Sequence, residues 1–419
     1  MLLRISPNQY AQLSKQNALI DLSGLLDQYG ENIKNAVSDL AWKSVTNDAG
    51  IINGMPHENM VASLDNTYGM LTGGIGVRSD MLEELGMELP TNLEDFTAFL
   101  EAAKEKYGIA PLTANKTSSF MQVLLTAFGM GEAEWYDVDG TYTHRIKHPQ
   151  IAAYLAYMQK LYSEGLMDND MPINTADNSK EKFASGNAIA CAPLMFWDIP
   201  SMVNALATSN PDCKIEFVTD LAPDADTQPS HYIMKGANFV TCISQNSKNP
   251  EHVVNWLNIL TEPDNFRRTY IGEEGVSYEM IDGNYYPIFE GDDATNFNAY
   301  TNSDKLSGFS DPLLAFQMWQ ARARKTPEMA EAYEAMNARV EEYEPLISIE
   351  AYGKTSPQVQ EYITALNQAF SDSFLKAVVE GTDPDEAVAA MQADWDANGG
   401  LEVEAAMQEF YDANKDFAG

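Results

Sequence analysis

The residues whose types best suit ligand binding are Trp197 and Asp198, at the end of the segment "FASGNAIACAPLMFWDIP" (residues 183–200). The segment is a small-residue turn followed by an apolar run too short to cross a membrane. The flat face of an indole can stack on the CH face of a sugar, and a neighbouring carboxylate can accept hydrogen bonds from its hydroxyls. The pair therefore predicts a surface for hydroxyl-rich ligands. Other aromatic residues near expected element ends, where a ring can face a cleft instead of a core, are Trp42, Tyr68, Phe120 and Trp319.

Motifs of nucleophilic catalysis and of cofactor binding do not occur in the sequence. There is no G-x-S-x-G elbow, and the glycines of "YGMLTGGIGV" do not form a dinucleotide fingerprint. The five histidines are scattered, with none paired at i, i+4: His57, His144, His148, His231 and His252. A carboxylate pair for glycoside hydrolysis remains open, because with 62 acidic residues almost any two could meet.

Metal sites and disulfides are not expected either. The fragment "DVDG" (137–140) lacks the remaining ligands of a calcium loop, and its setting favours a hairpin turn. The acidic segments 167–172 and 222–230 are typical of solvated turns. Cys191, Cys213 and Cys242 have no C-x-x-C spacing, and two of them sit inside apolar runs typical of buried cysteine. The sequence therefore predicts no cofactor and no metal.

The charge balance excludes one class of partner. The chain has 419 residues with 26 Lys and Arg against 62 Asp and Glu, which leaves a net charge of −36. Such a surface repels nucleic acid and anionic lipid headgroups, and it disfavours a strongly anionic small ligand unless a local basic pocket holds it. The length predicts at least two lobes, because one hydrophobic core does not grow to this size.

The elements that must position these residues alternate between helices and buried strands. Helices are expected after Pro7, over 91–107 with a capping box of Thr91 and Glu94, from Pro149 to Gly165, after Pro250, and from Ser356 to about Glu380 with a new start at Thr382. Apolar runs at 108–114, 187–196 and 238–244 predict strands. This alternation predicts an α/β architecture with mostly parallel sheets and a helical C-terminal third.

Several segments in order resemble the extracellular solute-binding proteins of bacterial ABC importers, of the lipoprotein type. The segments are "IINGMP" (51–56), "GVRSDMLEELGMELPTNLEDFTAFL" (76–100), "LYSEGLMDND" (161–170), "KFASGNAIACAPLMFW" (182–197), "ISQNSKNPEHVVNWLNIL" (243–260) and "IGEEGVSYEMIDG" (271–283). Each segment is weak alone. Together they are specific to the family, but not to a ligand.

The resemblance implies a two-lobed periplasmic-binding-protein-like (type II) fold with discontinuous lobes. Lobe one would comprise residues 1–111 plus about 244–305, and lobe two residues 112–243 plus about 306–419. The chain would cross between lobes near Ala110–Thr113 and Phe239–Ile243. A solute would be held between the lobes, with no chemistry done on it.

The resemblance also implies the site residues. The family's stacking Trp corresponds to Trp197, with Asp198 beside it, and a ligand-facing aromatic corresponds to Phe120. The cleft-edge loop after "GMP" carries His57, Glu58 and Asn59. Further candidates near the crossover, the "GEEG" turn and element ends are Asn238, Glu273, Trp42 and Tyr68.

Family members begin with a signal peptide, a lipid-attachment Cys and a strand-helix-strand unit, none of which precedes "MLLRISPNQYAQL" here. The expectation is a longer reading frame upstream and an extracellular, lipid-anchored full-length protein.

The expected function is capture of a small solute, preferably an oligosaccharide, by hinge closure of a monomer that serves ABC permease subunits. The alternatives are a secreted glycan-degrading enzyme, a carbohydrate-binding module, or a sensor lobe coupled to a chemoreceptor.

Overall fold

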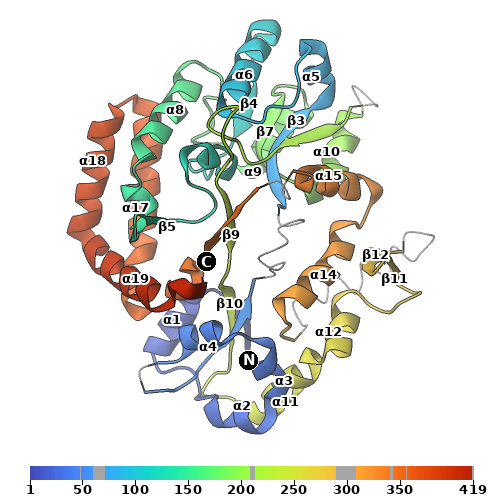
Figure 1. Ribbon diagram of the computed structural model, residues 1–419, viewed down its shortest axis with the longest axis vertical. Helices are drawn as coiled ribbons and strands as arrows, with labels where there is room; N and C mark the ends of the chain where they lie inside the picture. Colours follow the sequence, from blue (N-terminus) through green and yellow to red (C-terminus); the bar gives the residue numbers. More distant parts are fainter. Residues whose placement is uncertain are drawn as a thin grey trace.

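The computed structural model describes residues 1–47, 49–59, 71–207, 213–288, 308–339, 343–354 and 356–417. Two sheets organise it, and we name the lobes after them (Figure 1). Lobe one is built on the three-stranded sheet β1-β10-β2, and lobe two on the four-stranded sheet β4-β7-β3-β8. Both sheets are flanked by helices, as the alternating pattern predicts.

Lobe one combines segments from both sides of lobe two in the sequence. Its elements are β1 (Leu2–Ile5), α1 (Pro7–Lys15), α2 (Ser23–Tyr29), α3 (Glu31–Ala36), α4 (Asp39–Val45), β2 (Met55–Glu58), β10 (Ala237–Cys242), α11 (Pro250–Thr261) and α12 (Pro263–Tyr270). Strand β10 pairs antiparallel with both β1 and β2. Helix α1 begins as predicted, with Ser6 capping and Pro7 in the first turn.

Lobe two contains most of the central part of the chain. Its elements are β3 (Gly73–Arg78), α5 (Ser79–Leu85), α6 (Leu93–Tyr107), β4 (Leu112–Ala114), α7 (Gln122–Leu125), η1 (Thr126–Phe128), β5 (Trp135–Val138), β6 (Thr141–His144), η2 (Arg145–Lys147), α8 (Ile151–Ser163), α9 (Ala176–Ala184), β7 (Ala190–Met195), η3 (Phe196–Asp198), α10 (Ile199–Leu206) and β8 (Ile215–Val218). "DVDG" forms the β5–β6 hairpin turn, with Asp139 and Gly140 at positive φ.

The remaining elements connect the lobes or cover them. They are β9 (His231–Met234), β11 (Tyr278–Ile281), β12 (Asn284–Pro287), α14 (Pro312–Ala323), α15 (Pro327–Asn337), β13 (Pro345–Ser348), α16 (Glu350–Gly353), α17 (Pro357–Glu380), α18 (Pro384–Trp395), η6 (Asp396–Gly400), α19 (Leu401–Asn414) and η7 (Lys415–Phe417). Helices α17 and α18 pack on α8, and α19 packs on β6, so these C-terminal helices cover lobe two (Figure 1). The described residues of the last third are mainly helical as predicted, apart from the β11–β12 hairpin at its start and β13.

Three details differ from the sequence-based expectations. The strand pairs are mainly antiparallel, and β4–β7 and β9–β13 are the parallel pairs among the described strands. Strands from distant segments enter each sheet, so local helix–strand alternation does not fix their direction. The N-cap of α6 is Asn92 instead of Thr91, because the Asn92 side chain accepts the backbone N–H of Asp95.

The first lobe boundary is the third difference. Strand β3 hydrogen-bonds to β7 and β8, so residues 73–111 belong to the sheet of lobe two, not to lobe one. The first crossover therefore lies before Gly73, not at Ala110–Thr113. The second lies between β9 and β10, just before the predicted Phe239–Ile243.

Candidate functional site

A cleft with a volume of about 880 Å³ is lined by residues from both lobes. Lobe one contributes β2 and Phe239, and lobe two contributes the start of β3, the segment 117–123 and the segment 192–197. Strand β9 and helices α12 and α14 also contribute to the lining. This volume lies in the upper part of the range usual for small-molecule sites.

Trp197 lies in the cleft lining with 51% of its surface exposed. Its ring meets Phe196 edge-on at 5.1 Å, and Phe196 in turn packs against Trp319 at 5.7 Å. An exposed indole supported from behind by buried aromatics is a rigid apolar platform, because it needs little reordering to receive a ligand.

Asp198 does not line the cleft. Its Oδ1 accepts a hydrogen bond from Lys180 Nζ at 2.7 Å, and its Oδ2 accepts one from the Met195 backbone N–H at 3.1 Å. Both oxygens therefore fix the turn from β7 into η3, which carries Trp197. The prediction that Asp198 accepts ligand hydroxyls is not supported by this geometry; the residue positions its neighbour instead.

His57 lines the cleft and is held between two protein groups. Its ring stacks on Phe309 with the centroids 4.2 Å apart, and its Nε2 lies 2.8 Å from Thr241 Oγ1. Burial lowers the pKa of His57 to about 3, and nearby Arg4 adds to the effect. The imidazole is therefore neutral at physiological pH.

Glu58 and Asn59 follow His57 in the lining, and Glu58 is fully engaged. Its Oε2 accepts the Ser38 backbone N–H, and its Oε1 accepts the Ser38 hydroxyl, both at 2.7 Å. Tyr352 donates to the same Oε1 at 2.6 Å. Asn59 Nδ2 donates to the Met234 carbonyl at 3.2 Å. Glu58 therefore joins α4 to α16 and has few lone pairs left for a ligand.

Phe120 also lines the cleft, but one side of its ring belongs to the core. It packs against Phe370 and Phe374 at 4.9 and 4.7 Å, and the Arg145 guanidinium lies 5.0 Å from its centroid. The structure thus brings together Trp197, Phe120, His57, Glu58 and Asn59 around one cleft.

The other predicted residues do not join them. Trp42 packs in the core of lobe one, and Glu273 is exposed and pairs with Arg268 at 3.8 Å, outside the lining. Asn238 lies in β10 beside the cleft-lining Phe239, and its side chain is outside the described residues. Tyr68 is likewise outside the described residues.

Sequence reasoning missed several lining residues that distant segments supply. Phe239 is 44% exposed on the lobe-one side, and Arg322 and Lys325 come from α14 and the turn after it. Glu132 enters from the loop before β5. An aromatic residue in a crossover strand can face the cleft, so the sequence contains a signal for Phe239, although the predicted residue there is its neighbour Asn238.

Cationic side chains outnumber acidic ones in the described cleft lining, whereas acidic residues outnumber basic ones in the whole chain. The described lining contains Arg4, Arg322 and Lys325 against Glu58 and Glu132. Within the described ranges, no group of three His, Cys, Asp or Glu side chains is placed to hold a metal ion. Nor does any helix in this part of the chain have both the length and the apolar character to cross a membrane.

Comparison with known proteins matches residues 2–276 to the family described as bacterial extracellular solute-binding protein. The chain is 30% identical over 263 residues to an uncharacterised protein from the butB 5′ region of Niallia circulans, covering 62% of this chain and 98% of that one. It is 22% identical over 316 residues to lipoprotein LipO of Bacillus subtilis, covering 71% of this chain and 59% of LipO.

Two solved structures share the fold. One is the alginate-binding protein AlgQ2 without calcium ion, with a TM-score of 0.69, 18% identity, and coverage of 97% of this chain and 84% of AlgQ2. The other is the ABC-transporter substrate-binding protein FusA of S. pneumoniae in complex with kestose, with a TM-score of 0.66, 16% identity, and coverage of 98% and 86%.

Proposed function

Because the chain belongs to the family of bacterial extracellular solute-binding proteins, we propose that it captures an oligosaccharide between its lobes and presents it to the permease subunits of an ABC transporter. The observation that carries the choice of ligand is the supported, half-exposed indole of Trp197 in the cleft lining. Structural neighbours are named for alginate binding and for a complex with kestose, which supports a carbohydrate ligand.

A second exposed ring lies on the lobe-one side. Phe239 of β10 lines the same cleft as Trp197 of lobe two. Pyranose and furanose rings have apolar CH faces, which gain free energy when aromatic rings remove them from water. A ligand that touches both rings contacts both lobes, which is the requirement for closure driven by binding.

The mechanism we propose is hinge closure. The open form samples closed arrangements, and a ligand with contacts on both lobes shifts the population toward them. The connection between β9 and β10 is one crossing about which the lobes can turn. The permease subunits would then recognise the closed, loaded form.

The same proposal covers the cellular location of the protein, its attachment to the membrane and its oligomeric state. The family is described as extracellular, and LipO is named a lipoprotein, which supports an extracellular protein attached to the membrane by a lipid in its full-length form. We propose that it acts as a monomer, since its site is formed by two lobes of one chain.

A glycan-degrading enzyme is the alternative, and the acidic residues of the cleft favour binding. Retaining and inverting glycosidases use two carboxyl groups beside the scissile bond. Among the described lining residues the carboxyl groups are those of Glu58 and Glu132, and Glu58 is engaged by Ser38 and Tyr352. A turnover assay with the oligosaccharides used below distinguishes the two functions, since a binding protein leaves them intact.

The test is a thermal-shift screen followed by calorimetry with kestose, maltotetraose, cellotetraose and an alginate tetramer. A ligand at a hundred times its Kd adds about 2.7 kcal/mol to stability, which raises the Tm measurably. We expect at least one of these oligosaccharides to bind, and Trp197→Ala to weaken its binding about 10-fold or more.

The matched control is Trp256→Ala, which removes an indole that is 39% exposed on α11 and outside the cleft lining. Its affinity should equal that of the wild type. Unchanged affinity in the Trp197→Ala protein would contradict the stacking role, and a wild-type protein that binds none of the oligosaccharides would contradict the carbohydrate proposal.

A further inference from the structure

Glu132 is an acidic residue of the cleft to which the proposed function gives no role. It lies in the loop between η1 and β5, and its side chain is exposed to the cleft. Its carboxylate has no hydrogen-bond or ion-pair partner among the described residues. Glu58 is fully engaged, and Asp198 is engaged outside the lining. Among the carboxylates of the described lining, Glu132 is therefore the one whose oxygens are open to hydrogen bonds from a ligand.

The backbone on both sides of Glu132 is held firmly. Arg145 Nη2 donates to the carbonyls that flank it, at 3.2 Å to Gly131 and 2.5 Å to Ala133. The next two backbone N–H groups, at positions 134 and 135, both donate to Glu350 Oε2, at 2.7 and 2.8 Å. A buried cation and a buried anion thus fix one short loop, with Glu132 between them.

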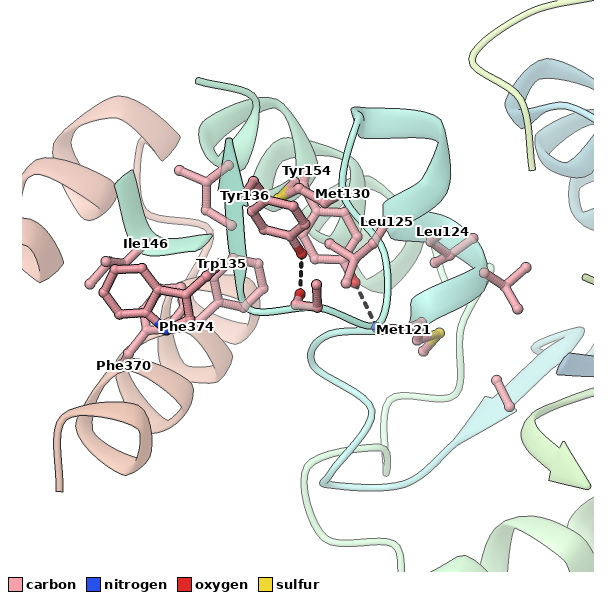
Figure 2. Close-up of a cluster of buried hydrophobic side chains, with 14 of the residues drawn as sticks. Met121, Leu124, Leu125, Met130, Trp135, Tyr136, Ile146, Tyr154, Phe370 and Phe374 are labelled. Carbon is pink, nitrogen blue, oxygen red and sulfur yellow. Dashed lines mark hydrogen bonds between the residues drawn. The ribbon is translucent and has the colours of Figure 1, made fainter. Parts of the chain in front are cut away.

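The loop is also anchored in the core below it. The Tyr136 hydroxyl donates to the Ala133 carbonyl. Figure 2 shows Tyr136 beside Trp135 and Met130 among buried side chains. Gly131 lies so close to Tyr232 that an added Cβ would meet its ring carbon at 2.8 Å. Because its backbone has little freedom, Glu132 presents its carboxylate with low entropic cost of binding.

The surroundings of Glu132 are acidic. Asp220 Oδ2 lies 2.6 Å from His231 Nδ1 in a pair whose side chains are each 2% exposed, and His231 lines the cleft. Partial desolvation raises the pKa of Glu132, the acids Glu350 and Asp220 raise it further, and His231 lowers it. The ionised form of Glu132 is therefore disfavoured in the empty protein. A ligand that donates hydrogen bonds to this carboxylate would stabilise it.

Resting on the proposed function, we propose that Glu132 accepts hydrogen bonds from hydroxyl groups of the bound oligosaccharide and selects a neutral sugar unit at this position. A carboxylate has two oxygens that can each accept from one of two adjacent hydroxyls, so it recognises a diol. A uronic acid unit at this position would place a further negative charge beside Glu132, Asp220 and Glu350. Like charges in a partly desolvated site repel, so acidic sugars are disfavoured here.

The test uses Glu132→Gln, which keeps the size of the side chain and removes its charge. With whichever of kestose, maltotetraose or cellotetraose gives the largest wild-type thermal shift, we expect Kd to rise about 10- to 100-fold at neutral pH. The empty variant should have a Tm equal to or above that of the wild type, because the substitution removes a like-charge repulsion. Retained stability shows that the loss of affinity is not misfolding.

A pH profile supplies a readout that a structural role would not change. The wild-type affinity should fall as the pH is lowered through the raised pKa of Glu132, because the protonated carboxyl is a poorer acceptor. The Gln variant should lack this step and keep only any dependence that arises from the other charged groups near it. These are Asp220, His231 and Glu350, with Arg145 bonded to the backbone carbonyl of residue 132 and Lys354 bonded to Glu350.

The control is Glu105→Gln, the same charge change on the exposed surface of α6, which should leave Kd and its pH profile unchanged. Wild-type affinity in the Glu132→Gln protein overturns this inference and leaves the proposed function intact. A wild-type protein that binds the alginate tetramer and none of the neutral sugars also overturns it. Failure to bind any of the four oligosaccharides contradicts the proposed function itself.

Discussion

Asp198, which the sequence suggests as a hydroxyl acceptor, and Glu58, a predicted cleft residue, both bind protein groups instead. Asp198 is held by Lys180 and by the backbone of Met195, and Glu58 by Ser38 and Tyr352. In both cases the carboxylate fixes a segment that carries a cleft-lining residue. An acid next to an aromatic in the sequence is thus as well suited to positioning that ring as to contacting a ligand.

This role of Asp198 is testable with Asp198→Ala. The substitution removes the Lys180 ion pair and the bond to the Met195 N–H, so the free energy of unfolding should fall by about 1–3 kcal/mol. Ligand affinity should fall several-fold, because Trp197 loses its fixed position. Lys180→Met keeps the backbone bond and should have the smaller effect in both urea denaturation and calorimetry. Equal effects of the two substitutions would argue against the positioning role.

The site was partly predictable because some of its residues are marked by local pattern. Trp197 stands at the end of an apolar strand between prolines, so local pattern marks it. His57 is indicated by the family resemblance, and it lies in β2 instead of the predicted loop. Glu132 could not be chosen from the sequence, since its exposure to the cleft depends on segments far away. The engaged state of Glu58 depends on Tyr352, a residue that the sequence places 294 positions away.

At the level of elements, local signals located the helices better than the sheet pairing. Pro7, Pro250 and Gly381 mark helix ends where the structure has them. The crossover that the resemblance implies at Ala110–Thr113 places β3 in lobe one, yet β3 pairs with β7 and β8. Backbone hydrogen bonds between distant strands leave no local trace in sequence, so strand order is the part of the fold that pattern reasoning misses.

One contact between elements predicts how stability depends on pH. His144 of β6 stacks on Trp395 of α18 at 4.3 Å, and its Nδ1 accepts the Ile146 N–H. Burial lowers the pKa of His144 from 6.5 to about 3. Below about pH 6.5 the unfolded chain therefore binds a proton that the folded protein does not. This histidine should cost about 1.4 kcal/mol of stability per pH unit as the pH falls toward 4.

Urea denaturation between about pH 7 and 4 measures this slope. His144→Gln should have a shallower slope than the wild type, whatever its stability at neutral pH. His252→Gln, which changes a histidine whose side chain is 77% exposed, should keep the wild-type slope. An unchanged slope in the His144→Gln protein would contradict the assignment of the proton to this residue.

At the scale of the whole molecule, the lobes are joined where backbones lie close together. Gly236 connects β9 to β10, and a Cβ added there would lie 2.1 Å from the Cβ of Ala351 in α16. Helix α16 also contacts α4 and β10 of lobe one, while α17, α18 and α19 pack on lobe two. The crossing is thus covered by a helix whose neighbours belong to both lobes.

Gly236→Ala should lower the free energy of unfolding by about 1–3 kcal/mol, because it overpacks this crossing. The double variant Gly236→Ala with Ala351→Gly lacks the opposing Cβ and should recover part of the lost stability. The Ala351→Gly single variant measures the separate cost of the lower helix propensity of glycine. A double-mutant cycle by urea denaturation measures the coupling. Strictly additive effects would show that the two positions do not meet.

The insertion of β10 between β1 and β2 has a consequence for how the chain acquires its structure as it is made. The four strands of the lobe-two sheet all lie between residues 73 and 218, whereas the lobe-one sheet lacks its middle strand until residues 237–242 have emerged. A growing polypeptide can therefore pair the strands of the lobe-two sheet first, while β1 and β2 still lack the strand that lies between them. Residues 2–5 and 55–58 therefore reach their native pairing only after the segment 73–218 has been synthesised.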